Sequence, residues 1–419
     1  MLLVCANLII LKKRILYKKL IDKIFKIKKI NICLNKIIFG KLLKVEIIKN
    51  IVAVKIIKIY SFILDSKFFN TKYLFMKKTY NTYKKSGVNM ATSDKLVNYI
   101  SKISRKTYKK NTETKSFKNI GSFGSVFDLS ALKMNNPLIV SSTDGVGTKI
   151  EIANQLKKYN TIGIDLVAMS VNDLIVQGAK PIFFLDYIAI NKLKYKKIKK
   201  ILDGIVSGCK LADCALVGGE MAEMPGTYAK NKFDLAGFAV GLVEKKNLLT
   251  KSKIKLNDIV LAVPSSGIHS NGFSLVRYIL KKKNLYLPPH IKKELIKPTK
   301  IYVKELNIIN KKKLINGCAN ITGGGLLGNL IRVIPDKLSL NINLSKIKTK
   351  PVFRWLKKNN INDSEMLKTF NCGVGFCLIT NKHNVKRIKK IFTKEYQPYQ
   401  IGFISKERLK IKTCGKLQW

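Results

Sequence analysis

The chain has 419 residues, of which 46% are hydrophobic, and its 80 Lys and Arg against 25 Asp and Glu give a formal net charge of +55. This length accommodates roughly two to three domains of ordinary globular composition. The sequence argues against two classes of protein. Specific nucleic-acid binding is not expected, because the excess charge is mostly lysine spread along the whole chain, while arginine is scarce. None of the eight cysteines forms a CxxC pair and only three histidines are present, so a zinc cluster is not expected. The same cysteine usage predicts a reducing, cytoplasmic location.

Residues 1–79 form a Lys- and Ile-rich extension with almost no glycine and no proline. Its apolar runs are interrupted by lysine and never reach the roughly 18 residues of a membrane span, so no transmembrane segment is expected. Three interpretations of residues 1–75 remain open. They are an organelle-import peptide, a basic segment that lies on a membrane surface, and a stretch upstream of a true start at Met76.

From residue 95 onward, apolar runs alternate with glycine loops, which predicts an α/β or α+β fold. Two domains are expected, at 80–250 and 251–419. The stretch 137–150 is expected to form a strand that runs into a glycine loop. The other predicted strands are 181–190, 215–226 with a Gly-Gly-Glu turn, 233–249 and 370–380. The predicted helices are 161–178 and 195–214. The stretch 258–280 is expected to form strand, loop and helix, and 319–334 a loop that enters a helix.

Four stretches combine glycine with an acid: "STDGVGTK" (142–149), "GIDLVAMSVND" (163–173), "VGGEMAEMPG" (217–226) and "DLAG" (234–237). One such pair is usually only a turn, and Asp165 or Asp173 alone fits a paired core acid or a helix-end acid. Their recurrence predicts Mg²⁺ held between carboxylates and a polyphosphate, with glycine backbone approaching phosphate oxygens. Lys149 would add a positive charge, and "GSFGS" (121–125) would act as a flap. A P-loop is absent from the sequence.

Two further loops of small residues occur in the second half, "SSGIHSNG" (265–272) and "TGGG" (322–325). Both are expected to precede helices, where free N–H groups bind anions. His269 lies among Ser, Gly and Asn, with little core to fill, so a functional role is favoured over a structural one.

Taken together, these stretches resemble the phosphoribosylformylglycinamidine cyclo-ligase family, also called aminoimidazole ribonucleotide synthetases. The resemblance runs in order from about residue 80 to 405. It also includes "TIGIDLVAMSVNDLIVQGAKPIFFLDYIA" (161–189), "ALVGGEMAEMPGTY" (215–228) and "ITGGGLLGNLIRVIP" (321–335). It implies a two-domain α/β protein with an N-terminal ATP-binding domain that dimerises. The implied reaction is ATP-dependent ring closure of formylglycinamidine ribonucleotide to aminoimidazole ribonucleotide in purine biosynthesis.

The resemblance also implies roles for individual residues. ATP and Mg²⁺ are the implied cofactors, with K⁺ as a further candidate. The implied metal ligands are Asp144, Asp173 and Glu220, and the implied catalytic residues are Asp144, Lys149 and His269. The nucleotide would contact Gly121, Gly124, Asp144, Gly145, Gly147, Asp165, Asp173, Gly178, Gly219 and Glu220. The substrate would contact Ser265, Ser266, His269, Asn271, Thr322, Gly323 and Gly324.

The sequence departs from the family pattern at several positions. Asn320 replaces a usual His and cannot transfer a proton, Met221 replaces Thr, and Gly328 stands where Glu is usual. A family lysine aligns with either Ser101 or Lys102. Two rival functions are kept: another ATP-dependent phosphoryl-transfer enzyme of the same superfamily, and a basic protein that binds nucleic acid or membranes through residues 1–75.

Overall fold

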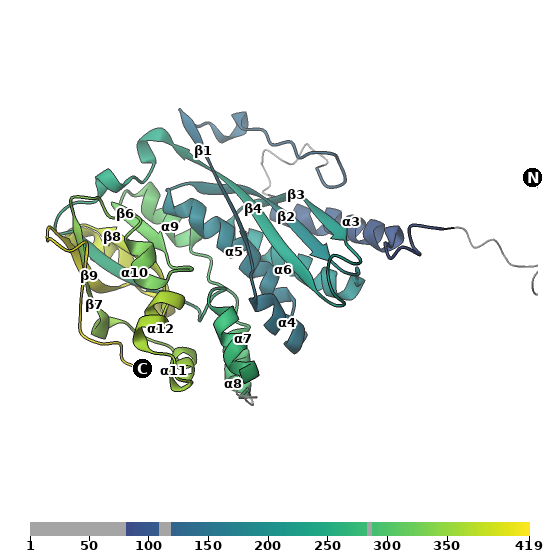
Figure 1. Ribbon diagram of the computed structural model, residues 1–419. Coiled ribbons are helices and arrows are strands. Elements are labelled where there is room, and N and C mark those ends of the chain that lie inside the picture. Colours follow the sequence, from purple (N-terminus) through teal and green to yellow (C-terminus); the bar gives the residue numbers. More distant parts are fainter. Residues whose placement is uncertain (1–80, 109–118, 283–286) are drawn as a thin grey trace, which may run out of the picture. The chain divides into compact units, whose positions relative to one another are not determined.

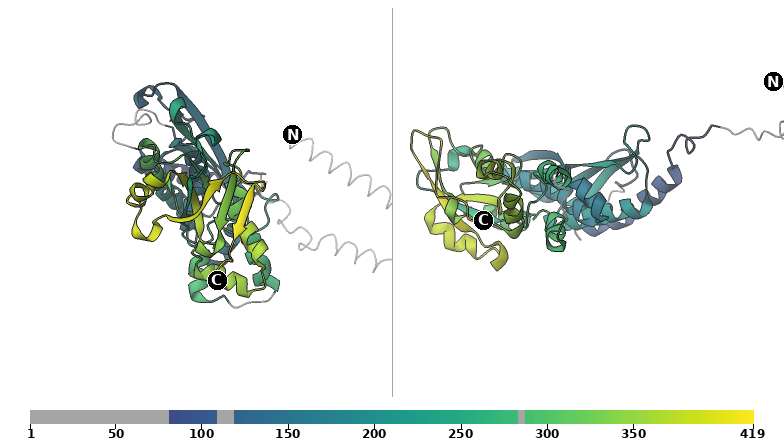
Figure 2. Two further views of the ribbon diagram at one scale, coloured as in Figure 1. Left: turned by 90° about the vertical axis from the view of Figure 1, so that its left-hand side faces the viewer. Right: turned by 60° about the horizontal axis from the view of Figure 1, so that its bottom comes forward.

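The structure, a computed structural model, describes residues 81–108, 119–282 and 287–419. The predicted extension 1–79 and its suggested roles therefore lie outside the described residues. Residues 81–419 form a compact unit with two β-sheets, each packed against helices (Figure 1). Figure 2 shows the elements of the first sheet in blue to teal and those of the second in green to yellow. Within the described ranges, no helix has the length and apolar character needed to cross a membrane.

The first sheet has four strands in the order β1-β4-β2-β3, and only β2 and β3 run parallel. Its register aligns Asp144, Gly237, Asp186 and Gly219 in one row across all four strands. The strands are β1 (Pro137–Gly145), β2 (Lys180–Ile190), β3 (Ala215–Glu223) and β4 (Phe233–Glu244). The accompanying helices are α3 (Met90–Ser104), α4 (Lys149–Leu156), α5 (Asn160–Val176) and α6 (Tyr195–Ala212).

Helix α5 packs against this sheet on one side and against α6 on the other. It is buried on most sides, as its long apolar run predicts. The two helices approach so closely that a Cβ on Gly163 would lie 2.3 Å from the Ile201 carbonyl oxygen. Helix α5 ends at a left-handed Gly178, whose N–H donates to the Ile175 carbonyl.

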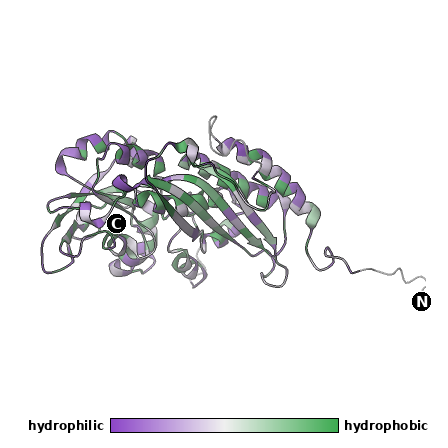
Figure 3. Cartoon of the chain, turned by 90° about the horizontal axis from the view of Figure 1, so that it is seen from above, coloured by the Kyte–Doolittle hydropathy of each residue, from purple (hydrophilic) through white to green (hydrophobic). Residues whose placement is uncertain are grey.

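The opposite face of the first sheet carries exposed apolar side chains. Ile139, Tyr187 and Phe238 are 67%, 42% and 42% exposed. Viewed from above, the strands carry green hydrophobic residues (Figure 3). Phe127, Leu132 and Met134 pack against Ile182, Val240 and Leu242 on part of this face.

The second sheet has six strands in the order β10-β7-β9-β5-β8-β6, and both of its faces are covered. Along β5, Val260 and Ala262 pack into one apolar cluster, while Leu261 and Val263 pack into another on the opposite face. The strands are β5 (Ile259–Pro264), β6 (Gly317–Asn320), β7 (Ser339–Asn343), β8 (Val374–Thr380), β9 (Tyr399–Ser405) and β10 (Ile411–Cys414). The helices are α7 (Phe273–Lys282), α8 (Pro289–Leu295), α9 (Val303–Lys311), α10 (Gly325–Leu330), α11 (Pro351–Lys358), α12 (Asp363–Thr369) and α13 (Val385–Lys389).

The predicted fold class and the principal strands and helices are confirmed, but one local prediction is wrong. The expected turn at Gly218–Glu220 does not form, because β3 continues in parallel register with β2 as far as Glu223. Gly219 instead allows β3 to approach the Asp186 side chain closely. A Cβ on Gly219 would lie 2.3 Å from a carboxylate oxygen of Asp186 on the neighbouring strand.

Candidate active site

Asp173 of the first half contacts β6 of the second half, and its charge affects a second predicted acid, Asp144. Asp173, on the last turns of α5, accepts a 2.9 Å hydrogen bond from the Asn320 side chain at the end of β6. Asp144, at the end of β1, is close enough to be affected by the charge of Asp173. Reduced hydration raises the pKa of both carboxyls, and the proximity of Asp173 raises that of Asp144 further.

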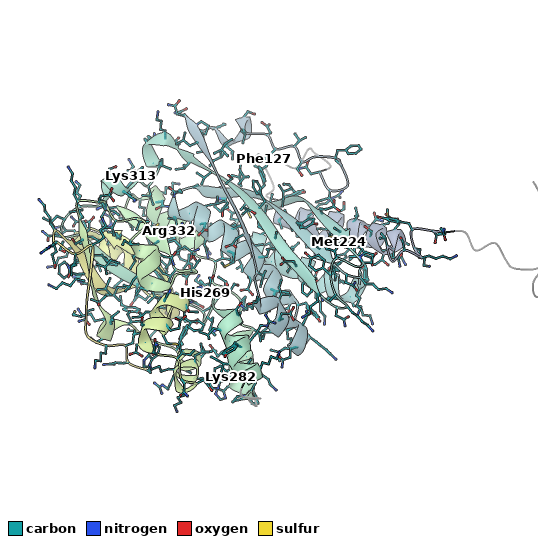
Figure 4. All side chains as sticks on the ribbon, viewed as in Figure 1. Phe127, Met224, His269, Lys282, Lys313 and Arg332 are labelled. Atoms are coloured by element: carbon teal, nitrogen blue, oxygen red, sulfur yellow. The ribbon has the colours of Figure 1, made fainter. Side chains whose placement is uncertain are left out.

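Positive charge near this pair comes from Arg332, which lowers the pKa of Asp173 without offsetting the loss of hydration. Figure 4 labels Arg332 together with His269. Carboxylates whose charges repel each other suit a divalent cation, because hard oxygen ligands lose this repulsion when Mg²⁺ binds to them.

The predicted glycine flap borders a cavity of about 600 Å³. Asn119 closes the base of the loop, since its side chain both donates to the Val126 carbonyl and accepts from the Val126 N–H. Ser125 ties the loop to β3 through a 2.7 Å bond to the Val217 carbonyl. The structure therefore brings four predicted nucleotide contacts to one cavity: Gly121, Gly124, Gly219 and Glu220.

Asp186 also lines this cavity, and it has no role predicted from the sequence although it lies within the stretch 161–189 that carries the family resemblance. It is only 4% exposed, and its Oδ1 has no hydrogen-bond partner among the described residues. Burial raises the pKa of its carboxyl to about 7. The available signal was an acid in the middle of the apolar strand "PIFFLDYIAI", where a buried carboxyl needs a reason.

Lys149 is completely buried and forms an ion pair of 2.8 Å with Asp165. Its ammonium group also donates to the carbonyls of His269 (2.9 Å) and Lys297 (2.7 Å), which belong to the second half of the chain. Thr299 completes the arrangement by donating its N–H and hydroxyl to Asp165. Burial lowers the pKa of Lys149 and Asp165 opposes this effect. In this conformation Lys149 and Asp165 connect the two halves of the molecule.

His269 has a buried, neutral ring. Its Nε2 accepts a 3.2 Å bond from the Ser266 N–H, and its backbone is left-handed with φ of 66°. Burial, with the charges of Lys149 and Lys350, lowers the pKa of its imidazole to about 3. Within the described ranges, neither His269 nor Lys149 reaches the paired acids through a hydrogen bond, so their catalytic roles stay predictions.

The two predicted substrate loops lie beside each other. A Cβ on Gly323 would lie 3.6 Å from the Asn271 side-chain oxygen, and the buried Asn271 amide nitrogen has no hydrogen-bond partner. The hydroxyls of Ser265 and Ser266 bond to the Gly267 and Pro298 carbonyls and so shape the loop from within.

Asn329, which lies in the stretch 321–335 but has no role predicted from the sequence, shapes the second loop. Its amide nitrogen lies 3.2, 3.1 and 2.8 Å from the carbonyl oxygens of Thr322, Gly323 and Gly325. Arg332 donates to the Asn329 oxygen at 3.2 Å. The left-handed Gly324 precedes α10, which puts Thr322, Gly323 and Gly324 in one turn held by Asn329.

Some predicted residues are not brought together. No trio of Asp, Glu, His or Cys side chains in the described ranges is placed to hold a metal ion. Asp144 lies on β1 and Glu220 on β3, with β4 and β2 between them. Gly145 donates its N–H to Asp144, and Gly147 is exposed with left-handed φ. Gly178 ends α5 against the carbonyl of Asn247, so its conformation already has a structural explanation.

Comparison with known proteins shows which family the chain resembles. Residues 127–243 match the family model described as AIR synthase related protein, N-terminal domain, and residues 255–413 match the corresponding C-terminal domain. The chain is 44% identical over 335 residues to a phosphoribosylformylglycinamidine cyclo-ligase of Thermodesulfovibrio yellowstonii, covering 78% of this chain and 96% of the relative. It is also 44% identical over 337 residues to one of Ligilactobacillus salivarius, with the same coverage.

Solved structures share the fold at low sequence identity. A thiamine-monophosphate kinase from Stenotrophomonas maltophilia superposes with a TM-score of 0.56 at 15% identity, covering 77% of this chain and 96% of that one. The hydrogenase maturation protein HypE of E. coli superposes with a TM-score of 0.56 at 13% identity, covering 77% and 94%. These two likenesses concern the fold alone. On the matched domains and the close relatives, the chain belongs to the phosphoribosylformylglycinamidine cyclo-ligase family.

Proposed function

We propose that this protein closes the imidazole ring of aminoimidazole ribonucleotide from formylglycinamidine ribonucleotide, with conversion of ATP to ADP and phosphate. The similarity to the cyclo-ligases covers 96% of their length, and their names describe this reaction. The observation that carries the proposal is the hydrogen bond from Asn320 of the second half to Asp173, whose charge also raises the pKa of Asp144.

The chemistry has two stages. The formyl oxygen attacks the γ-phosphorus of ATP, the bond from that phosphorus to the bridging oxygen breaks, and ADP leaves. An amidine nitrogen then attacks the former formyl carbon, phosphate leaves with the formyl oxygen, a proton is lost, and the ring closes. Such a reaction needs alignment and cationic stabilisation more than covalent help from side chains.

The described residues suit these tasks in distinct ways. Asp144 and Asp173 would hold Mg²⁺, which supplies positive charge to the transferring phosphoryl group. Asn320 fixes the orientation of Asp173, a task that an amide performs as well as an imidazole. Asn271 offers a donor with no protein partner to the substrate, beside the turn that Asn329 holds. K⁺ remains a candidate with no residue assigned.

Glu220 lies away from the paired acids, and we place it with the glycine flap in the nucleotide-binding part of the site. Residues 80–250 would carry the nucleotide and residues 251–419 most of the substrate contacts. Lys149 and Asp165 are proposed to position the SSGIHSNG loop, since Lys149 binds the carbonyl of His269.

A homodimer through the first sheet is part of this proposal. Ile139, Tyr187 and Phe238 leave an apolar sheet face in contact with water, and a second copy of the same face would bury it. A cytoplasmic location is also proposed. It is supported by the six cysteines in the described ranges, all of which are free.

The test is ADP release by the purified protein with ATP, Mg²⁺ and formylglycinamidine ribonucleotide. The parent should turn over only when the ribonucleotide is present. Asp173→Asn should lower kcat at least 100-fold, because a metal ligand would be lost, while the exposed Asp336→Asn should behave as the parent. ADP release that does not depend on the ribonucleotide would point to a different phosphoryl-transfer enzyme. Equal activity of the Asp173 and Asp336 variants would remove Asp173 from the site.

A further inference from the structure

A second cavity, of about 660 Å³, is lined by none of the residues of the candidate active site. It is formed by the end of α4, the start of α6 and the loop before β4. Its lining contains Glu151, Asn154, Lys157, Tyr159, Lys194, Lys196, Lys197, Lys200, Lys230, Asn231 and Lys232. Seven of these 11 residues are lysine, whereas 80 of all 419 residues are Lys or Arg. The general lysine richness of the chain therefore does not explain this concentration.

The positive charges in this cavity lack acidic partners among the lining residues. Glu151 is the one carboxylate in the lining, and it forms an ion pair with Lys232. The Lys194 ammonium group instead donates to the side-chain oxygen of Asn231 at 2.7 Å. Lys197 donates to the side-chain oxygen of Asn154 at 3.0 Å. Neutral partners leave the mutual repulsion of the ammonium groups in place.

The N-terminus of α6 adds further positive potential. Lys194 is the N-cap residue, its side chain makes no capping hydrogen bond, and the first turn contains no acid. Lys196 and Lys197 stand in that first turn instead. Cations are unfavourable at the positive end of the helix dipole, whereas acidic side chains at this end stabilise the helix. An anion in the cavity would interact favourably with both the lysines and the helix end.

Lys197 shows that the lysines are not simply spread over a solvated surface. Its ammonium group lies 3.6 Å from the centre of the Phe233 ring and 5.0 Å from that of Tyr159. Burial, with the charge of Lys194, lowers its pKa to about 8. The ammonium form of Lys197 is thus less favoured than that of an exposed lysine, and an anion in the cavity would favour it.

We propose that this lysine cavity binds a compact, multivalent phosphate anion, of the kind represented by inorganic triphosphate. Several phosphate groups match several ammonium groups, which act as point charges without the fixed geometry of arginine. The cavity favours a compact ligand over a nucleic-acid strand. Phe233 is only 5% exposed, and the Lys197 ammonium group lies over the half-buried ring of Tyr159, so little aromatic surface is left on which bases could stack.

The first experiment measures triphosphate binding by titration calorimetry at about 0.15 M salt, with the full chain. The test variant carries Lys194→Gln, Lys196→Gln and Lys230→Gln. The control carries Lys281→Gln, Lys282→Gln and Lys312→Gln, which removes the same charge from exposed positions. We expect one site in the parent, an affinity at least tenfold lower in the test variant, and less than a twofold change in the control. Circular dichroism melts establish that both variants are folded.

Lys197 provides a second readout that general charge loss would not give. At pH 8 its amine is partly neutral, so a bound anion should draw a proton onto it. The measured heat should then depend on the ionisation enthalpy of the buffer in the parent, and lose this dependence in Lys197→Met, which retains packing over Phe233. Three outcomes overturn the proposal: no binding by the parent, equal loss in both triple variants, or tighter cavity-dependent binding of a single-stranded oligonucleotide than of triphosphate.

Discussion

At the residue scale, the ion pair of Lys149 and Asp165 is the most consequential contact in the described part of the chain. Both side chains have no exposure to solvent, and Lys149 also binds carbonyls from the second half. Such a pair is costly to bury and still more costly to break, because removing one partner leaves an uncompensated charge. The sequence predicts a phosphate contact for the same lysine, so stability and catalysis must be separated by experiment.

Lys149→Met should lower the free energy of unfolding by about 3–5 kcal/mol, as measured by urea denaturation. The double variant Lys149→Met with Asp165→Asn should recover part of this loss, because an amide oxygen still accepts from Thr299 without carrying charge. A Lys149→Met protein with parental stability but no activity would instead favour the direct phosphate contact.

Asp186 should give the folded protein a characteristic pH dependence. Its folded pKa of about 7 lies above the ordinary value of 3.8, so the folded state binds the proton more tightly. This contribution to stability is present at low pH and is lost as pH rises through the folded pKa. Asp186→Asn should therefore gain stability relative to the parent between pH 4 and pH 7, by up to about 4 kcal/mol. If the difference in free energy of unfolding between the two proteins stayed constant across this range, the raised pKa of Asp186 would be contradicted.

At the element scale, the close crossing of α5 and α6 holds the helix whose last turns carry Asp173. The helices meet through glycines, and a Cβ on Gly204 would lie only 2.0 Å from the Asn160 carbonyl oxygen. A wider separation of the two backbones would be transmitted along α5 to its last turns. The glycines on the facing helices are therefore part of how the acids are placed.

Gly204→Ala should destabilise the protein by about 2–3 kcal/mol through overpacking and should also lower kcat. Gly328→Ala is the matched control, since Gly328 is exposed on α10 and a Cβ added there would have no atom within 4 Å. Gly328→Ala should leave the free energy of unfolding unchanged or raise it by up to about 1 kcal/mol, because alanine favours a helix more than glycine does. Chemical denaturation measures the free energy of unfolding of both variants. Similar losses of stability in the two would contradict the close packing of α5 against α6.

The elements also show what sequence patterns can and cannot predict. Periodicity is sufficient for α5, α6 and β5, because burial on each face is encoded locally. The turn expected at Gly218–Glu220 is wrong, because the need for Gly219 arises from Asp186 on a neighbouring strand. Asp186 and Asn329 escape prediction for the same reason, as their significance depends on partners that only the folded chain brings near.

At the scale of the whole molecule, the apolar face of the first sheet is expected to form the dimer. The parent should elute with the mass of a dimer in light scattering after size exclusion. Phe238→Lys should give a folded monomer, because a charge would be buried without a partner. Tyr278→Lys, on the exposed side of α7, is the matched control and should stay dimeric. A parent that is monomeric at all concentrations would contradict this assembly.

The most direct test of the central claim follows the formyl oxygen. Formylglycinamidine ribonucleotide carrying a heavy oxygen isotope in its formyl group would be converted with Mg²⁺ and ATP. Phosphorylation of that oxygen predicts that the label appears in inorganic phosphate, one atom for each aminoimidazole ribonucleotide formed. Label recovered in water, or ADP formed without labelled phosphate, would contradict ring closure through a phosphorylated formyl oxygen in this protein.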